Sequence, residues 1–161
     1  MAGKISKSVL FVCLGNICRS PTAEAVFRQR VSDYPQLDLS IDSAGTGAWH
    51  VGESPDERSQ QVGAQRGYPM GDLRARQVRP EDFEQFDYIL AMDRSNLSNL
   101  QQMMPADYSG HLGLFLEYAD TGLAEVPDPY YTGGDKGFHK VVDLIEAATD
   151  GLLEHLSKAG R

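Results

Sequence analysis

The stretch that decides the fold lies near the start of the chain, at residues 9–24, where the sequence is VLFVCLGNICRSPTAE. Its first four residues are large and apolar, which is typical of a strand buried on both faces in a parallel sheet. Gly15 and its polar neighbours then indicate a tight turn. A helix should follow, capped by Ser20 or a neighbour, with Pro21 at its first position. The stretch therefore predicts a strand, a loop and a helix in succession.

The rest of the chain continues this alternation of strands and helices. By their apolar patterns, strands are expected at residues 39–44, 88–92 and 112–116, and helices at 23–34, 55–66, 80–83, 95–103 and 138–156. The alternation predicts an α/β fold with three layers, a central four-stranded parallel sheet and helices on both of its faces. Ligands in such folds bind beyond the carboxyl ends of the strands, and the first such end is Cys13.

Length and composition narrow the class of protein. A chain of 161 residues suits one domain, residues 1–161. The formal charge of -8 argues against a general nucleic-acid binder, which usually has a basic face. No apolar run approaches the ~20 residues that span a bilayer. The two cysteines are too few for a disulfide scaffold or a zinc ribbon and favour a cytoplasmic protein.

The loop after the first strand has the residue types that bind a phosphate and attack it. Backbone N–H groups in such a loop, with the start of the helix, form an anion-binding nest. A cysteine facing the nest, Cys13, should ionise readily and act as a nucleophile. Arg19 offers a planar fork for two phosphate oxygens, and Ser20 can donate to the sulfur. An isolated cysteine is more often a small buried hydrophobe, but here the spacing and the context agree on a site.

Residues 12–24, VCLGNICRSPTAE, closely resemble the signature of the low-molecular-weight protein tyrosine phosphatases. The resemblance extends over nearly the whole chain, through residues 42–46, 75–77, 86–93 and 128–131. It implies hydrolysis of phosphotyrosine in proteins through a phosphocysteine, with Cys13 as nucleophile and Arg19 binding the phosphate. It implies no cofactor and no metal ion.

The resemblance also implies a set of residues around the substrate. Phosphate or a similar oxyanion would be held at the loop by Leu14, Gly15, Asn16, Ile17, Cys18 and Ser20. Asp128 would act as general acid and then as general base, although Asp-Pro pairs taken alone are more often plain turns. Tyr130 and Tyr131 would form walls of an aromatic pocket.

Three features of the sequence leave alternatives open. Trp49 follows the second strand and either stacks on the substrate ring or folds onto the protein. Cys18 either forms a protective disulfide with an oxidised Cys13 or is a core-facing spacer. Leu73 stands where many family members have a histidine that supports the loop asparagine. Ser43 is a candidate for carrying more of that support for Asn16.

Other functions fit the sequence less well. Arsenate reductases share the fold and a similar loop, but they use further cysteines downstream, and this chain has none after Cys18. A nucleotide-binding module would need a G-x-x-x-x-G-K-[ST] motif, which is absent. A non-catalytic phosphotyrosine-binding module would not need Cys13, Arg19 and Asp128 together. The sequence therefore favours catalysis.

Overall fold

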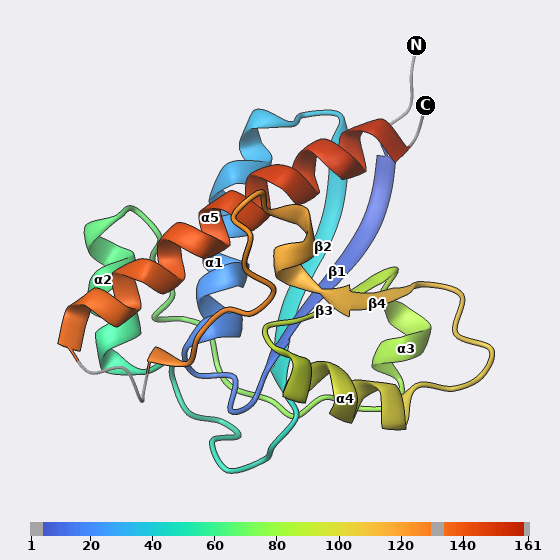
Figure 1. Ribbon diagram of the computed structural model, residues 1–161, viewed down its shortest axis with the longest axis horizontal. Coiled ribbons are helices and arrows are strands. Elements are labelled where there is room, and N and C mark those ends of the chain that lie inside the picture. The colour runs from blue at the N-terminus through green and yellow to red at the C-terminus, as the bar shows by residue number, and fades with distance from the viewer. Residues whose placement is uncertain (1–4, 130–133, 160–161) are drawn as a thin grey trace.

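The computed structural model describes residues 5–129 and 134–159, and a sheet of parallel strands forms its centre (Figure 1). The strands are β1 (Ile5–Cys13), β2 (Leu37–Gly45), β3 (Tyr88–Ala91) and β4 (His111–Leu114). They lie in the order β2-β1-β3-β4, and each neighbouring pair is parallel. The predicted four-stranded parallel sheet is confirmed.

Helices cover both faces of this sheet, as expected. They are α1 (Arg19–Arg30), α2 (Glu57–Gln65), α3 (Asp82–Gln85), α4 (Arg94–Met103) and α5 (Gly134–Ala159). Two short 3₁₀ helices, Val31–Asp33 and Phe115–Tyr118, follow α1 and β4. In Figure 1, α1 and α5 lie side by side on one side of the strands, and α3 and α4 lie on the other.

The burial of β1 explains its continuous apolar sequence. Successive side chains of a strand point to opposite faces. Val9, Phe11 and Cys13 belong to the core cluster shared with α1 and α5. Leu10 and Val12 belong to a second cluster, which includes Phe83 of α3 and Leu100 of α4. Because both faces are covered, β1 is apolar at every position near its end, and that end is fixed beneath the loop that follows.

The start of α1 differs from the expectation. The helix begins at Arg19, with Cys18 as its N-cap residue and no capping hydrogen bond from a side chain. Ser20 is therefore not the cap, because its hydroxyl bonds to Cys13 and Asn16 instead. Pro21 lies in the first turn rather than at the first position. The first N–H groups of α1, which lack partners within the helix, are consequently left without a capping side chain.

Other helix starts and strand ends follow from local chemistry. The side chain of Asp93 accepts from the N–H of Asn96 and caps α4. Asp56 caps α2 in the same way. The fourth strand is shorter than predicted, because the chain turns into a 3₁₀ helix at Phe115. Among the described helices, none has an apolar stretch long enough to cross a membrane.

Candidate active site

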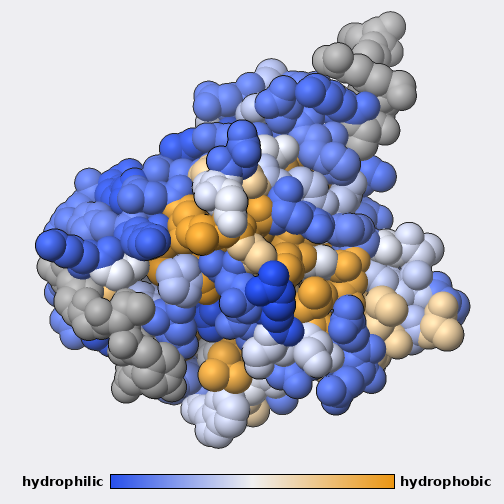
Figure 2. Space-filling model, in the orientation of Figure 1, coloured by the Kyte–Doolittle hydropathy of each residue, from blue (hydrophilic) through white to orange (hydrophobic). Residues whose placement is uncertain are grey.

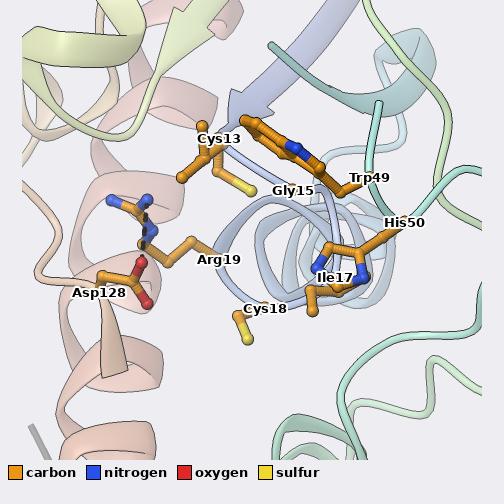
Figure 3. A pocket seen from close by; sticks show the side chains of 9 residues that line it. Cys13, Gly15, Ile17, Cys18, Arg19, Trp49, His50 and Asp128 are labelled. Carbon is orange, nitrogen blue, oxygen red and sulfur yellow. Dashed lines mark ion pairs between the residues drawn. The ribbon is translucent and has the colours of Figure 1, made fainter. Parts of the chain in front are cut away.

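A pocket opens at the carboxyl ends of the strands, where the loop from Cys13 to Cys18 joins β1 to α1. Its lining residues are Cys13, Leu14, Gly15, Ile17, Cys18, Arg19, Trp49, His50 and Asp128. Figure 3 shows Arg19 and Asp128 on one side of the pocket and Trp49 and His50 on the other. Figure 2 shows that one face of the molecule is mostly hydrophilic, with hydrophobic residues gathered near its middle. The pocket joins residues from distant parts of the sequence.

Contacts from outside fix the shape of the loop. The carbonyl of Cys13 accepts from the N–H of Thr46 at 2.9 Å, and the carbonyl of Ile17 accepts from the N–H of Asp56 at 2.7 Å. These carbonyls are thus bonded to neighbouring segments. The N–H of Asn16, in contrast, lies 3.3 Å from the sulfur of Cys13. The loop therefore presents an N–H donor to the thiol, as an anion-binding nest requires.

Cys13 lies at the base of the pocket with little exposure. Its residue is 3% exposed, and its sulfur lies 3.0 Å from the hydroxyl of Ser20. A hydroxyl and an N–H close to one sulfur can both donate to a thiolate. The structure brings Ser20 to Cys13 as the sequence predicted, although from within the helix rather than from its cap.

Asn16 has a left-handed backbone conformation, with φ at 59°. This conformation is uncommon outside glycine, and asparagine tolerates it better than most residues. Its side-chain amide donates to the hydroxyls of Ser20 at 2.7 Å and Ser43 at 3.0 Å, and its carbonyl accepts from the N–H of Arg76 at 3.0 Å. Ser43 thus supports Asn16, as predicted where Leu73 replaces the family histidine.

The support for Asn16 continues to a buried carboxylate. The hydroxyl of Ser43 donates to Glu24 at 2.7 Å, and this glutamate is only 2% exposed. Burial raises the pKa of Glu24, while the Ser43 hydroxyl and the Arg28 guanidinium act against that rise. Since Ser43 donates to Glu24, its oxygen is left to accept from Asn16. Sequence reasoning missed both Glu24 and Arg76, because only the fold brings them to the loop.

Arg19 is almost fully buried and firmly held. One terminal nitrogen, Nη1, donates to Asp93 at 2.7 Å and to the carbonyl of Val126 at 3.0 Å. The other, Nη2, lies 3.8 Å from a carboxylate oxygen of Asp128. Burial alone would lower the pKa of Arg19, but Cys13, Asp93 and Asp128 together raise it. The guanidinium is therefore charged and anchored by one nitrogen near Cys13.

Asp128 lies in the pocket opposite the loop, and its side chain is 27% exposed. It comes from the segment before α5, far along the chain from Cys13 and Arg19. A carboxyl group at the pocket wall can reach both solvent and a bound ester. The two predicted tyrosines that follow it, Tyr130 and Tyr131, lie outside the described residues.

Trp49 and His50 form the far wall of the pocket. Trp49 is 73% exposed as a residue, and its ring packs over the backbone of Gly47, where a Cβ would lie 1.9 Å from the ring. It thus folds onto its own loop and lines the pocket at the same time. His50 lies beside Gly15 and forms a 2.7 Å contact with Glu53. The sequence pattern offered no signal for His50.

Cys18 is buried in the same loop as Cys13, and both cysteines are free thiols. Burial raises the pKa of Cys18 to about 12, and a hydrogen bond with Ser59 only partly offsets it. Cys18 is consequently almost wholly protonated at neutral pH. Within the described parts of the chain, no three histidine, cysteine or acidic side chains lie close enough together to hold a metal ion.

Comparison with known proteins finds similar sequences over most of the chain. The family model described as low molecular weight phosphotyrosine protein phosphatase matches residues 8–161. The low molecular weight protein-tyrosine-phosphatase YfkJ of Bacillus subtilis is 44% identical over 153 residues, covering 94% of this chain and 96% of that protein. A low molecular weight phosphotyrosine protein phosphatase of Schizosaccharomyces pombe is 50% identical over 133 residues, covering 81% and 84% of the two chains.

A solved structure has a similar fold over nearly the whole chain. The crystal structure of a protein tyrosine phosphatase from Entamoeba histolytica, with Hepes in its active site, superposes with a TM-score of 0.90. The two chains are 42% identical, and the match covers 96% of this chain and 99% of the other. The likeness thus extends to the fold as a whole.

Replacing Ser43 with alanine should destabilise the loop. Ser43→Ala removes the acceptor of Asn16 and the donor to Glu24, which leaves two buried polar groups without that partner. We expect the free energy of unfolding to fall by about 1–3 kcal/mol and phosphate to bind more weakly. Denaturant unfolding and phosphate titration measure both effects. Ser40→Ala, at an exposed position of the same strand, is the matched control and should change stability by less than about 0.5 kcal/mol.

Replacing Gly45 with alanine should displace the loop. A Cβ at Gly45 would lie 2.7 Å from the carbonyl oxygen of Leu14 and 3.1 Å from the nitrogen of Asn16, both backbone atoms. We expect Gly45→Ala to weaken phosphate binding about tenfold, because the N–H groups of the loop move out of register. In Gly71→Ala the new Cβ meets only the flexible side chain of Gln60 at 3.3 Å. Equal phosphate affinity in the two variants would contradict the prediction.

Proposed function

Because the chain belongs to the low molecular weight phosphotyrosine protein phosphatase family, we propose that it hydrolyses phosphotyrosine in proteins through a phosphocysteine on Cys13. As a member of that family it is a cysteine-based phosphatase that needs no metal ion. The observation that supports the residue roles best is that Cys13, Arg19 and Asp128 line one pocket.

The first step is an in-line displacement at phosphorus. The thiolate of Cys13 attacks, and the bond between phosphorus and the phenolic oxygen breaks. Arg19 and the N–H groups of the loop stabilise the charge on the equatorial oxygens. Asp93 and Val126 engage Nη1 of Arg19, while Nη2 lies 3.8 Å from Asp128 at the pocket, where it would bind phosphate beside the acid. Asp128 gives its proton to the leaving phenolate.

The second step releases phosphate and restores the enzyme. Asp128, now a carboxylate, takes a proton from water as the water oxygen attacks phosphorus. The bond between phosphorus and sulfur breaks, and Cys13 leaves as a thiolate. The hydroxyl of Ser20, 3.0 Å from that sulfur, stabilises the leaving thiolate by donating to it. One carboxyl group thus serves as the acid and then as the base.

The walls of the pocket favour an aryl ester as the substrate. Leu14 and Ile17 from the loop and Trp49 from the opposite side line it, which gives an apolar surface for a phenyl ring. Trp49 is exposed enough to stack on that ring. We assign Tyr130 and Tyr131 to the same aromatic surface from the family resemblance. A protein with a phosphorylated tyrosine is the proposed partner, and the cytoplasm, where thiols stay reduced, is the proposed location.

Two substitutions test the roles of nucleophile and acid. Cys13→Ser should abolish turnover of 4-nitrophenyl phosphate and phosphotyrosine peptides while phosphate still binds. Asp128→Asn should lower kcat/KM by about 10²–10⁴ for esters with poor leaving groups and much less for good ones, because only poor leaving groups need the proton. A series of substituted phenyl phosphates measures this dependence.

The matched control for the acid is Asp107→Asn, an exposed carboxylate outside the pocket, which should leave every rate unchanged. Residual turnover by Cys13→Ser at the rate of the unaltered protein would disprove the phosphocysteine. A uniform loss across all leaving groups in Asp128→Asn would disprove the acid role.

We further propose that Cys18 protects an oxidised Cys13. Peroxide oxidises the Cys13 thiolate to a sulfenic acid, the sulfur of Cys18 attacks it, and a disulfide and water form. Cys18 must lose its proton to attack, and its pKa is raised by burial to about 12. Below that value the thiolate fraction rises about tenfold for each pH unit, so closure of the disulfide is slow at neutral pH and faster at alkaline pH.

The redox proposal predicts a change of product with pH. After mild peroxide treatment with dimedone present, mass spectrometry should find dimedone on Cys13 near pH 6 and more of the Cys13–Cys18 disulfide near pH 9. Cys18→Ser should give no disulfide at any pH. Persistent absence of the disulfide in the unaltered protein would reject the role of Cys18.

A further inference from the structure

We propose that Glu125 is a positioning residue for Asp128, which it serves by binding the segment before the acid to the first residue of α4. This inference rests on the acid role proposed above for Asp128. Glu125 does not line the pocket. It acts on the reaction through the backbone that carries the acid.

The acid lies on a long segment without regular structure. After the 3₁₀ helix ends at Tyr118, the chain from residue 119 to residue 128 forms neither helix nor strand. A segment of this kind needs contacts with the body of the protein if it is to hold a catalytic group in place. Two neighbouring residues, Glu125 and Val126, make such contacts shortly before Asp128.

Both residues bind the junction between β3 and α4. The N–H of Val126 donates to the carbonyl of Met92 at 2.8 Å. The carboxylate of Glu125 accepts from the N–H of Arg94 at 2.8 Å. Between these two positions, Asp93 binds Arg19 at 2.7 Å. Three consecutive residues of the junction thus hold the acid-bearing segment and the phosphate-binding arginine.

Arg19 is part of the same arrangement. Its Nη1 donates to the carbonyl of Val126 at 3.0 Å, and Val126 is fully buried. A shift of the segment at Glu125 would therefore displace Val126, and with it both Arg19 and Asp128. The side chain of Val126 is apolar and forms no hydrogen bond. The carboxylate of Glu125 therefore supplies the side-chain hydrogen bond that holds this part of the segment.

Electrostatics favour the bond between Glu125 and α4. Arg94 is the first residue of the helix, and its N–H is one of the four that have no partner within the helix. A carboxylate accepting from this N–H also lies at the positive end of the helix. The guanidinium of Arg94 lies farther away, at 3.8 Å, and is 68% exposed, so the backbone contact is the principal one. Asp93 caps the same helix through Asn96, and the two carboxylates thus bind different N–H groups.

The backbone donor can be removed without removing the carboxylate. Proline is favoured at the first position of a helix, because the N–H lost there has no helical partner. Asp93, the residue before it, has φ −146° and ψ 174°, in the extended region that a residue before proline prefers. Arg94→Pro therefore deletes only the donor to Glu125 and the Arg94 side chain, while α4 keeps its start.

The test compares four variants on a series of substituted phenyl phosphates. Glu125→Ala and Arg94→Pro should each lower kcat/KM about tenfold for leaving groups as poor as tyrosine, because a small displacement of the acid impairs proton transfer. For 4-nitrophenyl phosphate the loss should be less than about threefold, and phosphate should bind as before. Glu125→Gln, which keeps an acceptor, should recover most of the rate. Arg94→Ala keeps the N–H and should show the leaving-group dependence of the unaltered protein.

The outcomes separate this inference from the proposed acid. Asp128→Asn, measured on the same series, decides the acid role independently of Glu125. If Asp128→Asn shows the dependence on leaving group and both Glu125→Ala and Arg94→Pro lack it, Glu125 has no positioning role. An equal loss across all leaving groups in folded Glu125→Ala would reduce it to a structural residue. If Glu125→Ala does not fold, Arg94→Pro carries the test with the carboxylate intact.

Discussion

The site depends on the left-handed turn at Asn16. At φ 59° the backbone directs the N–H of Asn16 toward the sulfur of Cys13, and without that turn the loop could not enclose an anion. The conformation is held because the side-chain amide is bonded at both ends, to Ser20, Ser43 and the backbone of Arg76. A strained residue persists only where its surroundings determine it in this way.

The parallel sheet brings residues from three strand ends to the loop. Cys13 ends β1, Gly45 ends β2 and Asp93 follows β3, so that the carboxyl edge of the sheet supplies the proposed nucleophile, the support of the loop and the anchor of Arg19. Glycine is needed at position 45 because a Cβ there would collide with the backbone of the loop. Because β1 lies between β2 and β3, the loop that follows it lies between the ends of these two strands. The residues at those ends therefore contact the loop.

Sequence reasoning predicted the helices and strands from local patterns and the support of Asn16 by Ser43 from the family resemblance, but it missed other contacts between distant residues. The strand, loop and helix around Cys13 and the four-stranded sheet were predicted, because the apolar pattern of each element depends on residues close together in the chain. The expectation that Ser20 or a neighbour caps α1 was wrong: the N-cap residue is Cys18, it forms no side-chain capping bond, and the Ser20 hydroxyl lies 3.0 Å from the sulfur of Cys13. The bonds from Arg76 to Asn16 and from Arg19 to Asp93 join residues far apart in sequence, and no pattern in one sequence indicates such pairs.

Some of the negative charge of the protein lies around the buried guanidinium of Arg19. Its guanidinium lies among Cys13, Asp93 and Asp128, three groups that are negative when ionised, and they raise its pKa despite burial. An arginine buried without such partners would be costly. These anionic partners also orient Arg19. Asp93 binds one nitrogen of the guanidinium, and the other side of the group is directed at the pocket. The net charge therefore does not argue against the proposed phosphate site, since the field at the loop is set by Arg19 and the N–H groups around it.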